Sequence, residues 1–236
     1  MKQYYKIAGL TVEMDSFGKT VEQAEDYLIQ TPNAVDIVIR SDWKTLKEKA
    51  PHLSDEDCEY LSSGGNFYLQ LINFDGFLIH SSAVVMDGKA YIFTAPCGTG
   101  KSTHTSLWIK EFGNKAFILN DDKPAIRLEN GKFVVYGTPW SGKTDKNVNT
   151  SADLAGICLL NRGDKNEIQR ISGTKAVFGI LSQTVRPKNK EYMEKLLELL
   201  SNIINDVPVW ELHCNMDVEA ARVSYNAMSS VGENKN

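Results

Sequence analysis

The chain contains 236 residues, of which 42% are hydrophobic and 24% are charged, and its formal net charge is -4. These values are typical of a folded globular protein with one main core, alone or with a small appended lobe. A weakly acidic chain without a basic patch is not expected to bind nucleic acid or an anionic lipid surface.

Neither a membrane span nor a disulfide framework is predicted. No stretch approaches about 18 consecutive apolar residues, and Met1 to Lys6 lacks the apolar core of a signal peptide. The four scattered cysteines form no CxxC pair, so we expect reduced thiols and no zinc site. A cytoplasmic protein is the resulting expectation.

Residues 1–62 are expected to form a small N-terminal lobe. Strands are predicted over 4–13 and 35–40, separated by a polar, partly helical segment at 20–30. Residues 44–63 have a helical or irregular pattern.

The main domain is expected at residues 63–236, because Ser63-Gly64-Gly65-Asn66 is a strong turn signal. Three strand-like runs follow, with Asp75-Gly76 and Asp87-Gly88 between them as predicted hairpin turns; the runs are 67–73, 77–86 and 90–94. A helix is predicted at 102–112 and stops at Gly113.

The second half of the main domain mixes strands with helices. Strands are predicted at 116–119, 125–128, 133–136, 156–161, 168–171 and 209–213. We expect 168–171 to pair with 156–161, and Glu129-Asn130-Gly131 indicates an antiparallel hairpin. Helices are predicted at 188–205 and 218–228, and a frayed tail at 229–236.

Residues 95–102, Ala-Pro-Cys-Gly-Thr-Gly-Lys-Ser, fit the phosphate-loop pattern G-x-x-x-x-G-K-[ST] except at the first position, where alanine replaces glycine. Gly98 and Gly100 let backbone N–H groups turn inward, Lys101 supplies a mobile cation, and the Ser102 hydroxyl can ligate Mg²⁺. A strand before the loop and a helix after it favour a real phosphate site over a chance match. The expected nucleotide contacts are Ala95, Pro96, Cys97, Gly98, Thr99, Gly100, Lys101, Ser102 and Thr103.

Asp121 and Asp122 directly follow the apolar run 116–119. Phosphoryl transfer needs a carboxylate to hold the metal and often another to receive the proton of the attacking hydroxyl. A strand end is where such groups project toward a phosphate loop. The alternative is a solvated pair of loop acids, and the neighbouring phosphate-loop motif makes it the weaker interpretation.

His80 ends an apolar run, and one strand later the chain reaches the phosphate loop, so the two are expected to lie side by side in the sheet. From these residues alone, a hydrogen-bonded structural histidine is the stronger interpretation. His104 is expected to be a surface or packing residue, and His52 has no setting that indicates chemistry.

The parts His80-Ser81-Ser82-Ala83, 91–103 and Leu119-Asn120-Asp121-Asp122, in this order, resemble the HPr kinase/phosphorylase and phosphoenolpyruvate carboxykinase group. In that group a histidine strand precedes an atypical P-loop, and an Asp-Asp pair follows. The resemblance covers residues 75–145 well. It implies an α/β protein with an HPr kinase/phosphoenolpyruvate carboxykinase-like nucleotide-binding core, a mixed β-sheet and a small N-terminal α/β lobe.

The resemblance also implies roles for the candidate residues. His80 would lie near the metal and the transferred phosphate, and the two aspartates would bind the metal and handle the proton. We assign the metal to Asp121 with Ser102 and the base role to Asp122, while the reverse order stays open. Lys123 stands where the carboxykinases carry an acid, so the closer likeness is to small HPr kinase-like kinases that act on free serine or on serine in ribosomal peptides.

Residues 137–143, Gly-Thr-Pro-Trp-Ser-Gly-Lys, predict a rigid, shaped loop that forms a candidate acceptor wall around Trp140, Gly142 and Lys143. Lys143 is a candidate ligand for a phosphate or a carboxylate, whereas Trp140 either stacks on a substrate or anchors the loop in the core. Arg162 and Arg186 are candidate anion ligands or solvated surface charges.

The sequence therefore predicts an ATP- and Mg²⁺-dependent kinase that transfers the terminal phosphoryl group to a hydroxyl, with serine as the expected acceptor. Its predicted catalytic residues are Asp122, Asp121, His80 and Lys101. Two alternatives stay open: a nucleotide-binding regulatory or chaperone module, which the intact Asp-Asp pair disfavours, and a nucleotide hydrolase. A homo-oligomer is compatible with the sequence.

Overall fold

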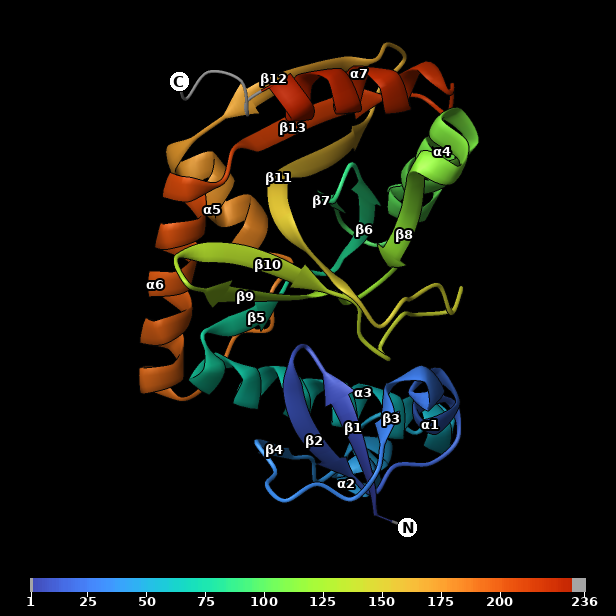
Figure 1. Ribbon diagram of the computed structural model, residues 1–236, viewed down its shortest axis with the longest axis vertical. Coiled ribbons are helices and arrows are strands. Elements are labelled where there is room, and N and C mark those ends of the chain that lie inside the picture. Colours follow the sequence, from blue (N-terminus) through green and yellow to red (C-terminus); the bar gives the residue numbers. More distant parts are fainter. Residues whose placement is uncertain (1, 231–236) are drawn as a thin grey trace.

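The computed structural model describes residues 2–230 and contains two β-sheets (Figure 1). The smaller sheet has the order β3-β1-β2-β4. Its strands are β1 (Gln3–Ile7), β2 (Leu10–Met14), β3 (Leu28–Ile29) and β4 (Ile37–Val38). Its helical elements are α1 (Lys19–Gln23), η1 (Glu25–Tyr27), α2 (Trp43–Lys49) and α3 (Asp55–Leu71). We refer to these elements together as the N-terminal lobe.

The main sheet has nine strands, and the path β5-β9-β10-β11-β7-β6-β8 describes most of it. The strands are β5 (Gly76–Leu78), β6 (Ser81–Met86), β7 (Lys89–Thr94), β8 (Ala116–Asn120), β9 (Ala125–Glu129), β10 (Lys132–Tyr136), β11 (Ser151–Arg162), β12 (Glu167–Ile171) and β13 (Val209–Cys214). β11 runs parallel to β7 and β13, whereas β6 is antiparallel to β7 and β8. The predicted mixed α/β architecture is therefore confirmed.

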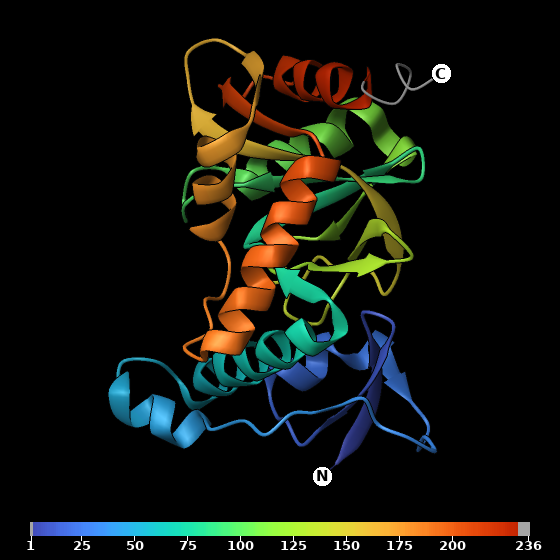
Figure 2. The ribbon, with the colours of Figure 1, turned by 90° about the vertical axis from the view of Figure 1, so that its left-hand side faces the viewer.

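Helices cover both faces of the main sheet. Its helical elements are η2 (Ile72–Phe74), α4 (Lys101–Phe112), η3 (Gly113–Lys115), α5 (Gly173–Leu181), α6 (Lys190–Asp206) and α7 (Glu219–Ser229). Along β6, Ala83 and Val85 pack with α5 and α6, whereas Val84 and Met86 belong to a core that includes residues of α4 and α7. This alternation with a period of two is expected for a strand buried on both faces. Figure 2 shows the long helix α6 running along one face of the molecule.

Several predicted elements match the structure closely. The Asp87-Gly88 and Asn130-Gly131 hairpins are confirmed, because β6 pairs antiparallel with β7 and β9 with β10. The helix expected at 102–112 is α4, and the one expected at 188–205 is α6. Of the predicted tail, residues 231–236 lie outside the described residues. No helix within 2–230 has both the length and the apolar character needed to cross a bilayer.

The strand predicted at 67–73 and the turn predicted at 63–66 are wrong, because residues 63–71 belong to the helix α3 and residues 72–73 belong to η2. Its buried Tyr60, Phe67, Tyr68 and Leu71 lie at helical spacing. Gly64 lies where the helix contacts Trp140: a Cβ atom there would be 2.9 Å from Trp140 Cδ1. The glycine permits close packing rather than a turn.

The single strand expected at 77–86 is wrong, because this segment forms two strands, β5 and β6, that are not neighbours in the sheet. Other expectations also differ from the structure. Asp75-Gly76 makes no hairpin, because Asp75 caps η2 in a left-handed conformation before β5 begins. β12 pairs with β13 and not with β11, because β13 lies between them. The helix α5 has no counterpart in the predicted elements. The expected boundary at 62/63 falls inside α3, and the division into domains stays a prediction.

Candidate functional site

The phosphate-loop motif lies between β7 and the N-terminus of α4, as its pattern predicts. Gly98 and Gly100 have φ values of 77° and 120°, which residues with a side chain rarely adopt. No described atom lies within 4 Å of a Cβ built at either position, so backbone conformation and not space requires glycine there. The free N–H groups of the first turn of α4 face the loop, which is the arrangement that binds anions.

Lys101 is buried at the start of α4, and its Nζ donates a hydrogen bond of 2.9 Å to the carbonyl oxygen of Ala95. Burial lowers the pKa of Lys101, while Cys97, Asp122 and Asp121 act in the opposite direction. Both aspartates therefore stabilise the positive charge of Lys101, whereas burial disfavours it. An anion bound in the loop would stabilise this charge further.

A side-chain-capped turn places the two aspartates after β8. The Asn120 Oδ1 accepts hydrogen bonds from the backbone N–H groups of Asp122 at 3.0 Å and Lys123 at 2.7 Å. The Asn120 Nδ2 donates to the carbonyl oxygen of Thr138 at 2.8 Å. Asparagine is suited to this task because its side chain mimics a backbone turn.

Asp121 is 6% exposed and receives two hydroxyl hydrogen bonds. Ser82 donates to its Oδ1 at 2.5 Å, and Thr144 donates to its Oδ2 at 2.8 Å. Ser82 also bonds Thr105 of α4 at 2.7 Å, which connects β6, the carboxylate and the phosphate-loop helix. Such contacts fix the orientation of a carboxylate and leave further lone pairs for a cation.

Asp122 lies between the side chains of His80 and Lys123. His80 Nε2 is 3.0 Å from its Oδ1, and Lys123 Nζ contacts its Oδ2. Burial raises the pKa of Asp122, but the hydrogen bond from His80 and the charge of Lys123 outweigh it, so the pKa lies below its usual value. Asp122 is therefore held as a carboxylate at neutral pH.

These groups line one cavity of about 450 Å³, which we call the phosphate-loop pocket. Its walls are His80, Cys97, Gly98, Gly100, Lys101, Ser102, Thr103, Asp121, Asp122, Gly142, Lys143 and Thr144. The predicted catalytic residues are thus brought together from the turn after β8, from α4 and from the β5–β6 connection. Within residues 2–230 no group of three or more His, Cys, Asp or Glu side chains is placed to hold a metal ion by itself, so a metal here would need oxygens from a ligand as well.

The N-terminal lobe holds the 137–143 loop against this pocket. The Tyr60 hydroxyl accepts a hydrogen bond from the Gly142 N–H at 2.8 Å, and Gln23 Nε2 donates to the Gly142 carbonyl at 3.1 Å. Trp140 is fully buried and stacks on Phe67 with ring centroids 4.9 Å apart. Of the two roles expected for Trp140, the structure shows the core anchor, whereas Gly142 and the exposed Lys143 face the cavity.

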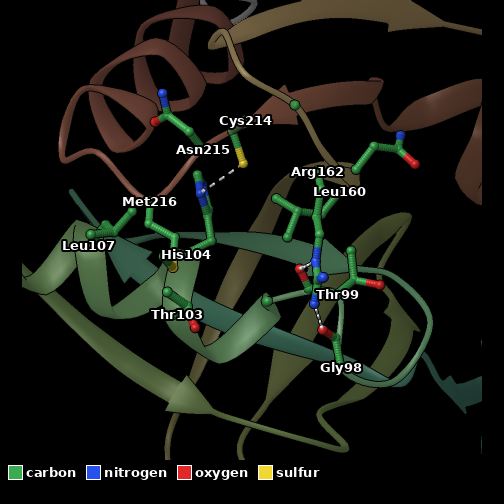
Figure 3. Close-up of a pocket in the computed structure, with 13 residues that line it drawn as sticks. Gly98, Thr99, Thr103, His104, Leu107, Leu160, Arg162, Cys214, Asn215 and Met216 are labelled. Carbon is green, nitrogen blue, oxygen red and sulfur yellow. Dashed lines mark hydrogen bonds between the residues drawn. The ribbon is translucent and has the colours of Figure 1, made fainter.

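A second cavity of about 480 Å³ also borders the phosphate loop (Figure 3). We call it the His104 pocket. Leu107, Leu160 and Met216 form apolar parts of its wall, and Gly98, Gly100 and Thr103 line both cavities. The Arg162 side chain at its edge donates hydrogen bonds to the carbonyl oxygens of Gly98 and Thr99 (Figure 3).

His104 is a buried packing residue of α4 rather than a surface one. Its Nε2 lies 3.1 Å from the Ser224 hydroxyl, and its Nδ1 lies 4.0 Å from Cys214 Sγ. Burial lowers the pKa of His104 to about 3 and raises that of Cys214 to about 11, so both side chains are neutral. Neither His52 nor Arg186 lines either of the two cavities formed by the described residues.

Several residues of the site were not predicted from the sequence. Asn120 had a readable signal, because an asparagine before two acids at a strand end is a turn-forming residue. Ser82 belongs to a segment that carries the family resemblance, whereas Thr105 and Thr144 are small hydroxyl residues without any distinguishing local pattern. Gln23 and Tyr60 lie 119 and 82 residues from Gly142 in the chain, so only the fold brings them there.

Comparisons with known proteins do not identify a family for this chain. No family model and no curated protein matches the chain. Among solved structures, the Hpr(Ser) kinase/phosphatase from Coxiella burnetii aligns with 66% of this chain and 98% of its own, with 11% sequence identity and a TM-score of 0.40. Values this low indicate at most a distant fold relationship, so a function has to be argued from the residues of this chain.

Proposed function

We propose that the protein is an ATP-dependent kinase that uses Mg²⁺ and transfers the terminal phosphoryl group to a hydroxyl, with serine as the favoured acceptor type. One observation carries this proposal: the phosphate loop, two aspartates and a histidine from separate elements line one cavity. Phosphoryl transfer depends mainly on positioning and charge neutralisation, and this cavity supplies groups for both.

The proposed phosphoryl donor, ATP, fits the two cavities that border the phosphate loop. The loop amides, Lys101 and the N-terminus of α4 would hold the phosphates. The His104 pocket would hold the nucleoside, because it is lined by apolar and polar groups and adjoins the loop directly (Figure 3). Arg162 would hold the loop in its conformation through its hydrogen bonds to the carbonyl oxygens of Gly98 and Thr99.

The oxygen-bearing side chains of the pocket are suited to bind Mg²⁺. Ser102 and the aspartates offer one hydroxyl and two carboxylates, and Mg²⁺ typically takes one or two carboxylates together with phosphate oxygens and water. Bound there, the metal would neutralise charge on the transferred phosphoryl group. Asp121 is the better ligand because Ser82 and Thr144 already orient it.

Asp122 is the proposed base. Because its pKa lies below the usual value, it is ionised before the reaction and would accept the proton of the acceptor hydroxyl as the new P–O bond forms. His80 would orient Asp122 and add positive charge near the transferred phosphoryl group when protonated.

The test is to incubate the protein with ATP, Mg²⁺ and a panel of free serine, hydroxylated metabolites and serine peptides, and to measure ADP and acceptor mass. A kinase gives acceptor-dependent ADP release and a mass gain of one phosphate, which Asp122→Asn abolishes while nucleotide binding is kept. Acceptor-independent ADP release would instead show a hydrolase, and binding without turnover a regulatory module. Lys101→Ala should weaken nucleotide binding itself.

A further inference from the structure

A third cavity lies along the outer edge of the main sheet, between α4, β8 and the segment 146–148. It is an open groove of about 620 Å³, which we call the β8 groove. Its walls are Ser106, Ile109, Lys110, Ala116, Phe117, Ile118, Lys146, Asn147 and Val148. In Figure 1, α4 and β8 lie on the side of the molecule opposite α6.

The strand that forms the floor of this groove has an edge that is only partly covered. β8 pairs with β6 on one side and ends the path of the described strands. On its other side, Leu119 and Asp121 bond the backbone of Val148 and Lys146, each at 3.0 Å. No described strand pairs with this edge at Ala116–Ile118. An open strand edge is a template for an added extended chain.

The groove combines an apolar floor with positive charge at its rim. Phe117 and Val148 are 41% and 42% exposed and line the same groove, so together they form an apolar surface available to a partner. Lys110 and Lys146 are exposed and line the groove, whereas no Asp or Glu does. This arrangement is complementary to an apolar side chain with acidic neighbours.

The β8 groove lies next to the phosphate-loop pocket, because the same two elements form walls of both. α4 contributes Ser102 and Thr103 to the pocket and Ser106 and Lys110 to the groove. The loop contributes residues 142–144 to the pocket and 146–148 to the groove. An occupant of the groove is therefore held by the same two elements that flank the aspartates.

We propose that the β8 groove binds the polypeptide segment that carries the acceptor hydroxyl, which makes the acceptor an extended peptide or protein segment rather than a free amino acid. This inference rests on the proposed kinase function. From Ser102 to the middle of the groove wall at Ser106 and Ile109, α4 rises about 6 to 10 Å. An extended chain covers that distance in about two to four residues. The groove thus selects an apolar residue at that separation from the acceptor, with acidic residues beside it.

The experiment compares kcat/KM for four acceptors: free serine, a serine peptide with leucine two to four positions away and aspartates beside it, the same peptide with lysines, and the same peptide with alanines. The acidic leucine peptide should be the best substrate. The variant Lys110→Glu/Lys146→Glu should lower its kcat/KM by at least about tenfold and should favour the lysine peptide instead. ATP binding and the activity with free serine should not change.

A charge reversal on α6, Lys195→Glu, is the matched control and should leave the peptide preference unaltered, because α6 lies on the far side of the molecule. Val148→Glu adds a second test within the groove, because its side chain is 42% exposed there, and it should also lower kcat/KM for the acidic leucine peptide. Equal rates with all four acceptors, or a double variant with unchanged preference, would overturn the proposal. Self-association that the double variant abolishes without any effect on peptides would assign the groove to a second copy.

Binding of the fluorescent acidic peptide, measured by anisotropy without nucleotide, separates this inference from the proposed function. If no acceptor is phosphorylated but the peptide binds with the charge preference described, the kinase function fails and the polypeptide site stands. If serine is phosphorylated and the peptide neither binds nor reacts, the kinase function stands and the groove proposal fails.

Discussion

The Tyr60 hydroxyl accepts a hydrogen bond of 2.8 Å from the backbone N–H of Gly142, and this contact joins the N-terminal lobe to the phosphate-loop pocket. Gly142 lies beside Asp122: a Cβ built on it would be 2.9 Å from the Asp122 Cβ. Its φ of 77° also excludes most other residues. The N-terminal lobe therefore positions one wall of the candidate active site.

We predict that Tyr60→Phe impairs the acceptor side of the reaction selectively. Phenylalanine keeps the packing but leaves the Gly142 N–H without its acceptor, which costs about 1 to 2 kcal/mol. We expect kcat/KM for the acceptor to fall by about 5 to 30-fold with little change in nucleotide affinity. Tyr5→Phe, which removes a hydroxyl that bonds Gln3 within the lobe, is the control. Equal losses in both variants would contradict a positioning role for Tyr60.

Lys123 should set the pH at which the reaction becomes active. Its ammonium group helps to hold the pKa of Asp122 below the usual value, so Lys123→Met should raise that pKa. The base must be ionised, and the acid limb of the kcat/KM profile should therefore move to higher pH. Lys132→Met, which removes an exposed lysine 3.9 Å from Asp153, should leave the profile in place. A shift to lower pH would show that Asp122 is not the titrating base.

The sequence predicted those parts of the site whose residues are close to one another in the chain. The phosphate loop, its helix and the Asp121-Asp122 pair each depend on neighbouring residues, and the structure brings them into one cavity. The glycine pair in α3 misled the prediction, because the packing of Gly64 against Trp140 is a contact between residues 76 positions apart that no local signal reveals. The two interpretations of Trp140 could likewise be separated only by its burial against Phe67.

His104 should make the protein less stable in mild acid. Burial lowers its pKa from 6.5 to about 3, so the folded state keeps it neutral while the unfolded state takes up a proton below pH 6.5. The unfolded state then binds more protons, and the free energy of unfolding falls as the pH drops. Between pH 7.5 and 5.5 this contributes about 1.4 kcal/mol of destabilisation.

The measurement is urea unfolding of the wild type and of His104→Gln at both pH values. The variant removes the titrating group, so its loss of stability between the two pH values should be smaller by about 1.4 kcal/mol, whatever its absolute stability. His52→Gln, which changes an exposed histidine, should behave like the wild type. An identical pH dependence in wild type and His104→Gln would show that His104 is not the source of the effect.

The adjacent glycines of α3 should respond to alanine in opposite directions. A Cβ at position 64 would lie 2.9 Å from Trp140 Cδ1, within the tightly packed contact that anchors the 137–143 loop, whereas no described atom lies within 4 Å of a Cβ at position 65. Gly64→Ala should therefore destabilise the fold by about 1 to 3 kcal/mol through overpacking. Gly65→Ala should stabilise it by about 0.5 to 1 kcal/mol, because alanine loses less conformational entropy in a helix. Thermal unfolding of the two variants tests both signs, and stabilisation by Gly64→Ala would mean that the contact between α3 and Trp140 is looser than described.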